Sequence, residues 1–289
     1  MFPEIIDTKP LRRAVDNGLT WVVRNWGDEF EAAAYPLLML LKAIEDLLVA
    51  TPWWLIIVIL TGIAWLATRR WQLPAVVLVS LLFLGVMDLW KDAMTTTALM
   101  IAATLTAILV SIPVGVWMSR SLRVRQVITP VLDLMQTLPS FVYLIPTVMI
   151  FGPGKIPALI ATIVYAAPPL VRLTDLGLRT VDPAVMEASR AFGTNPRQRL
   201  LGVQIPLALP TILAGINQTT MMALAMVVIA SMIGAGGLGY QVLQGIGRLE
   251  VSRGLFAGLG IVVLAIIFDR VIQAFGKQLQ ARIGMQEAR

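Results

Sequence analysis

The sequence contains no cysteine and no histidine. Disulfides, thiolate and imidazole metal sites and the common Ser/His or Cys/His nucleophile systems are therefore excluded, and an enzymatic site would be hard to build. Charged residues are also scarce, at 14% against about 25% in a typical soluble domain. Hydrophobic residues make up 57% of the chain, and its mean hydropathy is +0.80. This composition indicates a membrane protein.

Long apolar runs follow residue 50. Each is close to the ~20 residues that a helix needs to cross about 30 Å of hydrocarbon. We therefore expect an all-α polytopic membrane protein with about seven transmembrane helices, at residues 52–68, 72–90, 95–118, 127–151, 156–174, 207–235 and 253–275. Prolines should interrupt the hydrogen-bond ladder of the fourth and fifth spans, at Pro139, Pro146, Pro168 and Pro169.

Residues 1–50 are more polar and too interrupted to span. Apolar side chains recur there at helical spacing, at Leu37, Leu41, Ile44 and Leu48, while charged residues fall on another face, at Lys42, Glu45 and Asp46. We expect an extracytoplasmic amphipathic segment that either lies at the membrane interface or packs on the rest of the protein. It is not expected to begin with a signal peptide, because Pro3, Glu4 and Asp7 precede any apolar run.

Lysine and arginine indicate the orientation, because they accumulate on the cytoplasmic side of a membrane protein. One side collects Arg69, Arg70, Arg120, Arg123, Arg125, Arg172, Arg179, Arg190, Arg197, Arg199, Arg270, Lys277, Arg282 and Arg289, and the opposite connections hold only Lys91, Lys155, Arg248 and Arg253. We expect the N-terminus outside and the C-terminus in the cytoplasm. The net charge of +6 follows membrane sides in this way, so it does not indicate a nucleic-acid partner.

A polar, basic stretch between two apolar runs, residues 181–206, stands out. Asp182 and Pro183 are a helix N-cap followed by proline at the first helical position. Gly193 suits the left-handed residue that ends such a helix, and Asn195 and Pro196 repeat the start signal. The sequence therefore predicts two short helices with a glycine corner.

The first of these helices should carry a small apolar ridge. Val185, Ala188 and Phe192 fall on one face at spacings of three and four residues. Such a ridge, projecting from a membrane surface, favours a protein partner. The alternative is that this stretch is an ordinary basic loop that only connects two spans.

The same stretch resembles the coupling loop in the membrane subunit of ATP-driven (ABC) importers, whose pattern is Glu-Ala-Ala, three residues, Gly, nine residues and Ile-x-Leu-Pro. The matching positions here are Glu187, Ala188, Ser189, Gly193, Val203, Ile205 and Pro206, with Ser189, Val203 and Ile205 departing conservatively. Over residues 95–275 the chain is similar to permeases of the glycine betaine/choline/proline betaine branch, at residues 136–146, 217–218 and 231–239.

This resemblance implies a type I ABC importer permease, with a core at residues 95–276 that includes a cytoplasmic coupling loop at 175–206. Two additional transmembrane helices at 51–94 precede the core, and a cytoplasmic tail, 277–289, follows it. It implies a bacterial inner-membrane homodimer, two ABC ATPase subunits and an extracytoplasmic substrate-binding protein. ATP and Mg would be bound by the ATPases, so this non-catalytic chain would hold no cofactor. The residues it points to for ATPase coupling are Val185, Glu187, Ala188, Ser189, Phe192, Gly193 and Pro206.

Polar and glycine residues inside the spans are candidates for the pathway and its gate, namely Gln136, Pro139, Asn217, Gln218, Ser231, Gly234, Gly236 and Gly237. For Gln136, Asn217 and Gln218 the alternative is hydrogen bonding between helices. No cluster of aromatic and acidic residues suggests a cage for a quaternary ammonium group. Selectivity is therefore expected to reside mainly in the separate binding protein.

Three further interpretations concern single contacts. Asp133 and Arg172 are expected to pair across two antiparallel spans, unless Arg172 reaches the headgroups and Asp133 bonds the basic loop at 120–125. Glu187 either caps a helix end or pairs with an ATPase arginine. Gly254 is a small-residue helix contact whose partner is open.

The runner-up function is a secondary transporter or channel driven by an ion gradient. Such a protein usually carries midplane carboxylates for its coupling ions. Asp133 and Asp269 lie toward the cytoplasmic ends of their expected spans instead, which disfavours this alternative.

Overall fold

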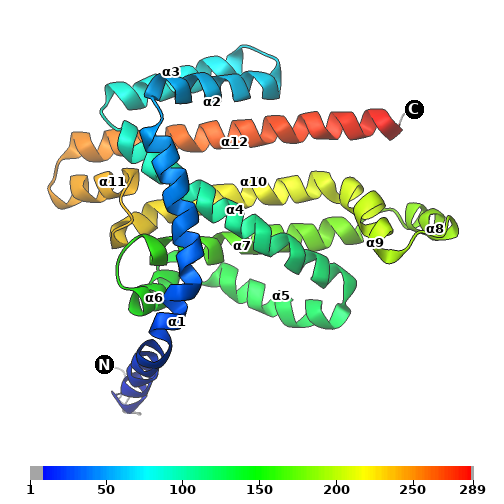
Figure 1. Cartoon of the computed structure of the whole chain (residues 1–289), viewed down its shortest axis with the longest axis horizontal. Helices are drawn as coiled ribbons and strands as arrows, with labels where there is room; N and C mark the ends of the chain where they lie inside the picture. Colours follow the sequence, from blue (N-terminus) through cyan, green and yellow to red (C-terminus); the bar gives the residue numbers. More distant parts are fainter. Residues whose placement is uncertain (1–8, 288–289) are drawn as a thin grey trace, which may run out of the picture.

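The computed structural model describes residues 9–287, which form helices and connecting turns with no β-strand in that range (Figure 1). Pro3, Glu4 and Asp7 lie outside the described residues. The helices are α1 (Lys9–Ala50), α2 (Trp53–Thr68), α3 (Gln72–Val86), α4 (Trp90–Arg120), α5 (Leu122–Thr137), α6 (Ser140–Phe151), α7 (Lys155–Arg179), α8 (Pro183–Ala191), α9 (Pro196–Arg199), α10 (Ile205–Ala230), α11 (Leu238–Gly247) and α12 (Val251–Glu287). A π-helical turn, η1 (Leu200–Gln204), precedes α10, and a 3-10 turn, η2 (Ser231–Ile233), follows it. The expected all-α class is confirmed.

The core lies where α7 packs between α4 and α10. Its contacts are made largely by small side chains, and those completely buried include Ala98, Ala102, Ala103, Ala158, Ala161 and Ala223. A Cβ on Gly115 of α4 would lie 2.6 Å from Cβ of Thr174 on α7, so only glycine permits this approach. Small residues let helices in a membrane approach closely and gain van der Waals contact.

The number of spans differs from the expected seven. Within residues 9–287 four helices are long and apolar enough to cross a membrane, or up to six if two bent helix pairs each count as one span. The bent pairs are α1 with α2, at 107°, and α5 with α6, at 99°. α3 has 15 residues and so reaches only about 22 Å at ~1.5 Å per residue, less than the hydrocarbon thickness.

The run at 127–151, expected as one span, is two helices that meet at Pro139. Leu138 is extended, with ψ 133°, and Pro139 is the N-cap of α6. A residue before proline is driven out of the helical region by the proline ring. The sequence predicts an interruption here, but the chain turns sharply instead of kinking.

The other proline pair leaves its helix continuous, because α7 runs through Pro168 and Pro169. Neighbouring helices supply hydroxyl groups at this point. Ser111 donates to the carbonyl of Ala167 (3.2 Å) and Thr219 to that of Ala166 (2.9 Å). These two bonds join α7 to α4 and α10 at the level of the prolines.

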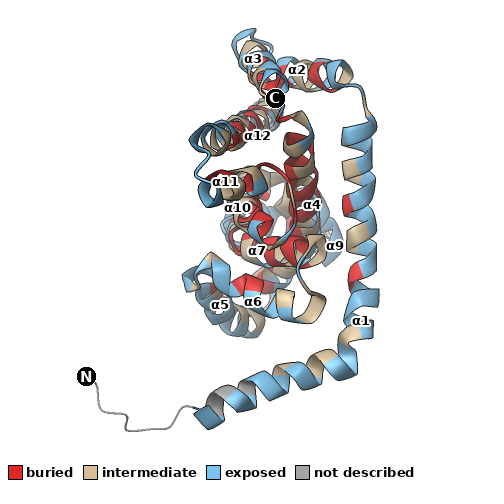
Figure 2. Ribbon diagram, turned by 90° about the vertical axis from the view of Figure 1, so that its left-hand side faces the viewer, coloured by how far each residue is buried: buried red, intermediate tan, exposed pale blue. Residues whose placement is uncertain are grey.

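α1 is a single long helix that runs crosswise to α4, α7, α10 and α12, and Figure 2 shows it along one side of the bundle. The apolar face expected at Leu37, Leu41, Ile44 and Leu48 packs against the central core, and Leu41 is fully buried. The N-terminal half is mostly exposed (Figure 2). Packing on the rest of the protein is thus what the structure shows for the second half of this segment.

Glu45, on the face of α1 that carries the charged residues, has partners on the bundle. Its carboxylate contacts Nζ of Lys155 at the start of α7 (2.6 Å) and Oγ1 of Thr95 on α4 (3.2 Å). The ion pair offsets the cost of a partly buried carboxylate. It fastens α1 to the ends of two core helices.

α2 and α3 form a hairpin that packs on α12. Leu81 and Leu84 of α3 are completely buried in a cluster that also includes Leu264 and Ile267 of α12. The side-chain amide of Gln278 donates to the carbonyl of Leu66 (2.8 Å). The two additional helices therefore share a core with α12, the last helix of the chain.

Candidate functional site

The stretch at 181–206 forms a projection at one end of the bundle, labelled α8 and α9 in Figure 1. Asp182 caps α8 by accepting from the backbone N–H of Ala184 (2.8 Å), and Pro183 is its first residue. Gly193 has φ 75° and follows the last turn. The predicted start of α8 and its glycine corner are confirmed.

The second predicted helix is not a separate one. Asn195 and Gln198 form a capping box, as the start signal indicates, but α9 has only four residues. It continues through η1 into α10 as one rod, residues 196–233. Pro206 supplies no N–H, and the turn before it pairs the N–H of Ile205 with the carbonyl of Leu200, five residues back. A π-type turn joins the corner to the long helix in this way.

The expected ridge is on the surface. Phe192 is 89% exposed and Val185 40%, and Ala188 and Glu187 are exposed as well. Exposed aromatic groups of this size are typical anchors of protein interfaces. Glu187 forms no hydrogen bond or ion pair with another described residue, while Asp182 caps α8, so capping by Glu187 is not what this structure shows.

Ser189 and Pro206 do not share this surface. Ser189 is buried, and its Oγ lies 2.6 Å from Oγ1 of Thr194, whose N–H in turn reaches the carbonyl of Ser189 (3.3 Å). The serine that replaces alanine in the family pattern thus holds the glycine corner closed. Pro206 is half-buried in the first turn of α10.

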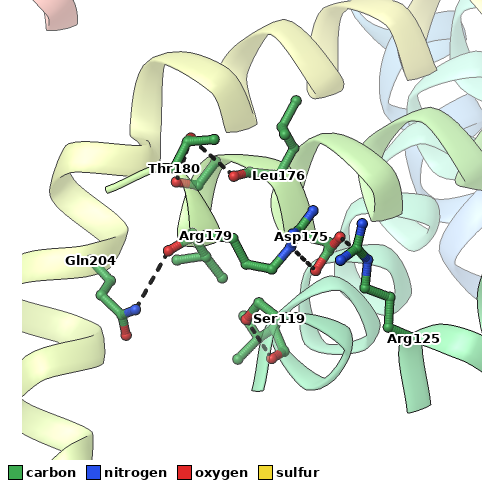
Figure 3. Close-up of polar contacts among 10 residues, drawn as sticks. Ser119, Arg125, Asp175, Leu176, Arg179, Thr180 and Gln204 are labelled. Carbon is green, nitrogen blue, oxygen red and sulfur yellow. Dashed lines mark hydrogen bonds and ion pairs between the residues drawn. The ribbon is translucent and has the colours of Figure 1, made fainter. Parts of the chain in front are cut away.

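Behind the ridge, α7 ends in a charged cluster that sequence analysis missed. The carboxylate of Asp175, only 7% exposed, lies 3.0 Å from Nε of Arg179 and 3.4 Å from Nε of Arg125 on α5 (Figure 3). Arg120 of α4 donates to the carbonyl of Pro196 (3.3 Å). An acid four residues before an arginine was the available signal. The Asp175 contacts join α5 to the end of α7, and the Arg120 bond ties the projection to α4.

The predicted pair of Asp133 and Arg172 is present: Nη2 of Arg172 contacts Oδ1 of Asp133. The alternative partners in the 120–125 loop are not used, because Arg125 contacts Asp175 instead. α5 is therefore held to α7 by two ion pairs of opposite polarity.

The candidate pathway residues separate into two groups. Asn217 donates to Asp269 on α12 (3.3 Å) and lines a cavity of about 270 Å³ between α10 and α12. This arrangement supports the helix-bonding alternative for Asn217. Gln136 on α5, Pro139 at the bend after α5 and Gln218 on α10 are exposed instead.

The glycine-rich segment after α10 is irregular, as expected. Gly234, Gly236 and Gly237 all have positive φ, between 79° and 97°, and Ser231 is fully buried in η2. A Cβ on Gly237 would lie 2.4 Å from Oγ1 of Thr96, which accepts from the N–H of Leu238 (2.9 Å). Thr96, which sequence analysis did not select, therefore anchors this segment to α4.

The partner of Gly254 is in the same chain. A Cβ on Gly245 of α11 would lie 2.5 Å from the backbone nitrogen of Gly254 on α12. α11 and α12 thus meet backbone to backbone at the end opposite to the projection (Figure 1).

Comparison with known proteins identifies the family. Residues 107–281 match the family described as "Binding-protein-dependent transport system inner membrane component". The chain is 46% identical, over 94% of its length and 77% of the relative's, to the glycine betaine/proline betaine transport system permease protein ProW of Escherichia coli. It is 39% identical, over 91% of its length and 93% of the relative's, to the glycine betaine transport system permease protein OpuAB of Bacillus subtilis.

The fold agrees with this match. A solved structure of the MetNI methionine ABC transporter superposes with a TM-score of 0.59 at 22% identity, over 68% of this chain and 95% of the other. The resemblance noted in residues 95–275 is confirmed. The chain belongs to the inner-membrane components of binding-protein-dependent transport systems, and it is a non-catalytic, multi-pass permease subunit of an ABC importer.

Proposed function

We propose that this permease carries glycine betaine or a closely related quaternary ammonium osmolyte, such as proline betaine or choline, into the cytoplasm. The observation that carries the proposal is the 46% identity to ProW across nearly the whole chain. The family implies partner ATPase and binding-protein subunits. ATP and Mg are bound by the ATPases, and the binding protein selects the substrate.

The assembly that fits this role has two copies of the chain and two ATPases, arranged with the closed symmetry usual for soluble and membrane oligomers alike. α8 faces the cytoplasm, where the charge distribution puts it, and its ridge, Val185, Ala188 and Phe192, docks in a groove on one ATPase. Glu187, exposed beside the ridge, pairs with an ATPase arginine. The N-terminus lies outside.

The pathway runs between the two copies. Gln136 is exposed on the amphipathic helix α5 and Gln218 on the apolar helix α10, and polar residues at membrane depth usually face a cavity rather than lipid. Gly234, Gly236 and Gly237 form the outer gate, where irregular backbone is tolerated beside a water-filled space. Asn217 supports this pathway from behind through its bond to Asp269.

An ion-gradient mechanism has less support. Asp133 and Asp269 are engaged by side chains of neighbouring helices, Arg172 and Asn217, and Asp175 near the end of α7 is paired with Arg125 and Arg179. Because all three already have partners, they give little support for a site that binds a coupling cation.

Uptake by the reconstituted complex tests the proposal. Proteoliposomes containing the permease and its ATPase, supplied with the binding protein outside and ATP inside, should accumulate labelled glycine betaine without any ion gradient. Unlabelled proline betaine and choline should be compared as competitors, with methionine as the unrelated control. Uptake that does not depend on ATP, and that is lost when an ionophore dissipates an ion gradient, would contradict the proposed importer.

A further inference from the structure

A basic cavity of about 620 Å³ lies between the turn that joins α2 to α3 and the C-terminal half of α12. Its polar lining comes from both elements, at Arg70, Gln72, Arg270, Gln273, Lys277 and Gln278. It is remote from α8 along the chain and contains none of the residues assigned to coupling or to the pathway.

The cavity attracts anions. Three of its lining side chains are cations and none is a carboxylate. None of these three charged groups takes part in the ion pairs or side-chain hydrogen bonds found among the side chains that the structure describes. The adjacent acid, Asp269, is not part of the lining. It accepts hydrogen bonds from Asn217 (3.3 Å) and from the lining residue Gln273 (2.6 Å). Clustered charges of one sign beside low-dielectric walls concentrate the opposite ion.

The surroundings belong to the boundary between hydrocarbon and headgroups. Trp71 is 76% exposed at the turn, and Leu66, half exposed, precedes it on α2. The guanidinium of Arg69 lies 5.3 Å from the centre of the Trp65 ring. Exposed tryptophan beside arginine marks the interface level of a membrane protein, and this is the side on which basic residues accumulate.

We propose that this cavity binds the phosphate of an anionic phospholipid. Arg70, Arg270 and Lys277 contact the phosphate, and the acyl chains run along the exposed apolar surface of α2. Basic pockets between transmembrane helices on the cytoplasmic side have the chemistry that such headgroups need. An apolar surface continuous with the pocket favours a lipid over a free phosphate ion.

The site is held by the protein itself. Gln278 donates to the carbonyl of Leu66 (2.8 Å) on the far side of the turn, so both walls are connected before the lipid binds. A bound phosphate would neutralise the repulsion between cations from α3's turn and from α12. The lipid therefore fastens the additional hairpin to the permease core.

Native mass spectrometry of the purified transporter complex tests this site, with phosphatidylglycerol and phosphatidylcholine of equal chain length as probes. Each cation near a headgroup contributes about fivefold in affinity, so Arg70→Gln, Arg270→Gln and Lys277→Gln should each weaken phosphatidylglycerol binding by about that factor and the triple variant by roughly a hundredfold. Phosphatidylcholine binding should not change. Arg123→Gln removes an exposed basic residue on the same side, outside the cavity, and is the control.

Inorganic phosphate distinguishes the two sources of the anion. If millimolar phosphate displaces phosphatidylglycerol from the complex, the site takes free phosphate and the lipid proposal is wrong. Equal loss of phosphatidylglycerol in the single variant Arg70→Gln and in Arg123→Gln would also overturn it, because each removes one positive charge and the effect would then be one of overall charge.

Discussion

Phe192→Asp should abolish ATP-driven uptake while the subunit stays inserted and dimeric. Phe192 is 89% exposed at the tip of the projection, so the change removes nothing from the core. Burying a phenylalanine contributes about 2 kcal/mol or more, and its loss weakens binding roughly thirtyfold. A buried, unpaired carboxylate adds to that cost. We therefore expect loss of ATPase association in a pull-down, with substrate-stimulated ATP hydrolysis lost in parallel.

The control for this variant is Leu249→Asp. Leu249 is 86% exposed, lies at the opposite end of the bundle, and already has a positive φ of 58° that aspartate tolerates. It adds the same charge to an exposed apolar position and should leave ATPase association intact. Equal loss of ATPase binding in both variants would mean that added charge, rather than the ridge, is responsible.

Gly193→Val should uncouple the ATPase from transport through the backbone. Gly193 has φ 75°, and a Cβ there would meet nothing within 4 Å. Its cost is therefore conformational and not a clash: a left-handed residue with a side chain costs roughly 1–2 kcal/mol, and a β-branched one is the least suited. We expect the backbone at position 193 to leave the left-handed conformation, which changes the direction of α8 and its ridge relative to α10.

A series at this position isolates the cause. Gly193→Asn should retain most ATP hydrolysis stimulated by substrate, since asparagine visits the left-handed region, whereas Gly193→Ala should be intermediate and Gly193→Val the poorest. Uptake and ATPase association are measured for each. The same activity for Asn and Val would show that the corner's backbone conformation does not matter for coupling.

Local signals explain why the projection was so predictable. Asp182 with Pro183 and Asn195 with Pro196 satisfy backbone N–H groups within three residues of themselves, and Gly193 adopts its positive φ without help from distant residues. Such caps depend on neighbours in sequence. The merging of α9 with α10 depends on the π-helical turn η1, in which the N–H of Ile205 reaches the carbonyl of Leu200. No residue pattern predicts such a turn.

Distant partners explain what was missed. The partner of Glu45 could not be predicted, because Lys155 lies 110 residues away along the chain. The contact between Asp175 and Arg125 could not be predicted, because it forms only when α5 packs against α7. The sharp bend at Pro139 replaced an expected span because proline predicts an interruption and not its angle. Apolar length alone likewise could not distinguish the short α3 from a spanning helix.

Cross-linking from the ridge tests the central claim, that this permease is driven through α8. The chain has no cysteine, so Ala188→Cys places a single thiol in the middle of the ridge without altering any other position. With a thiol-to-amine reagent, the active complex should give one adduct of permease and ATPase, and Leu249→Cys should give none. An Ala188→Cys complex that still drives uptake with ATP but forms no adduct with the ATPase would contradict the account.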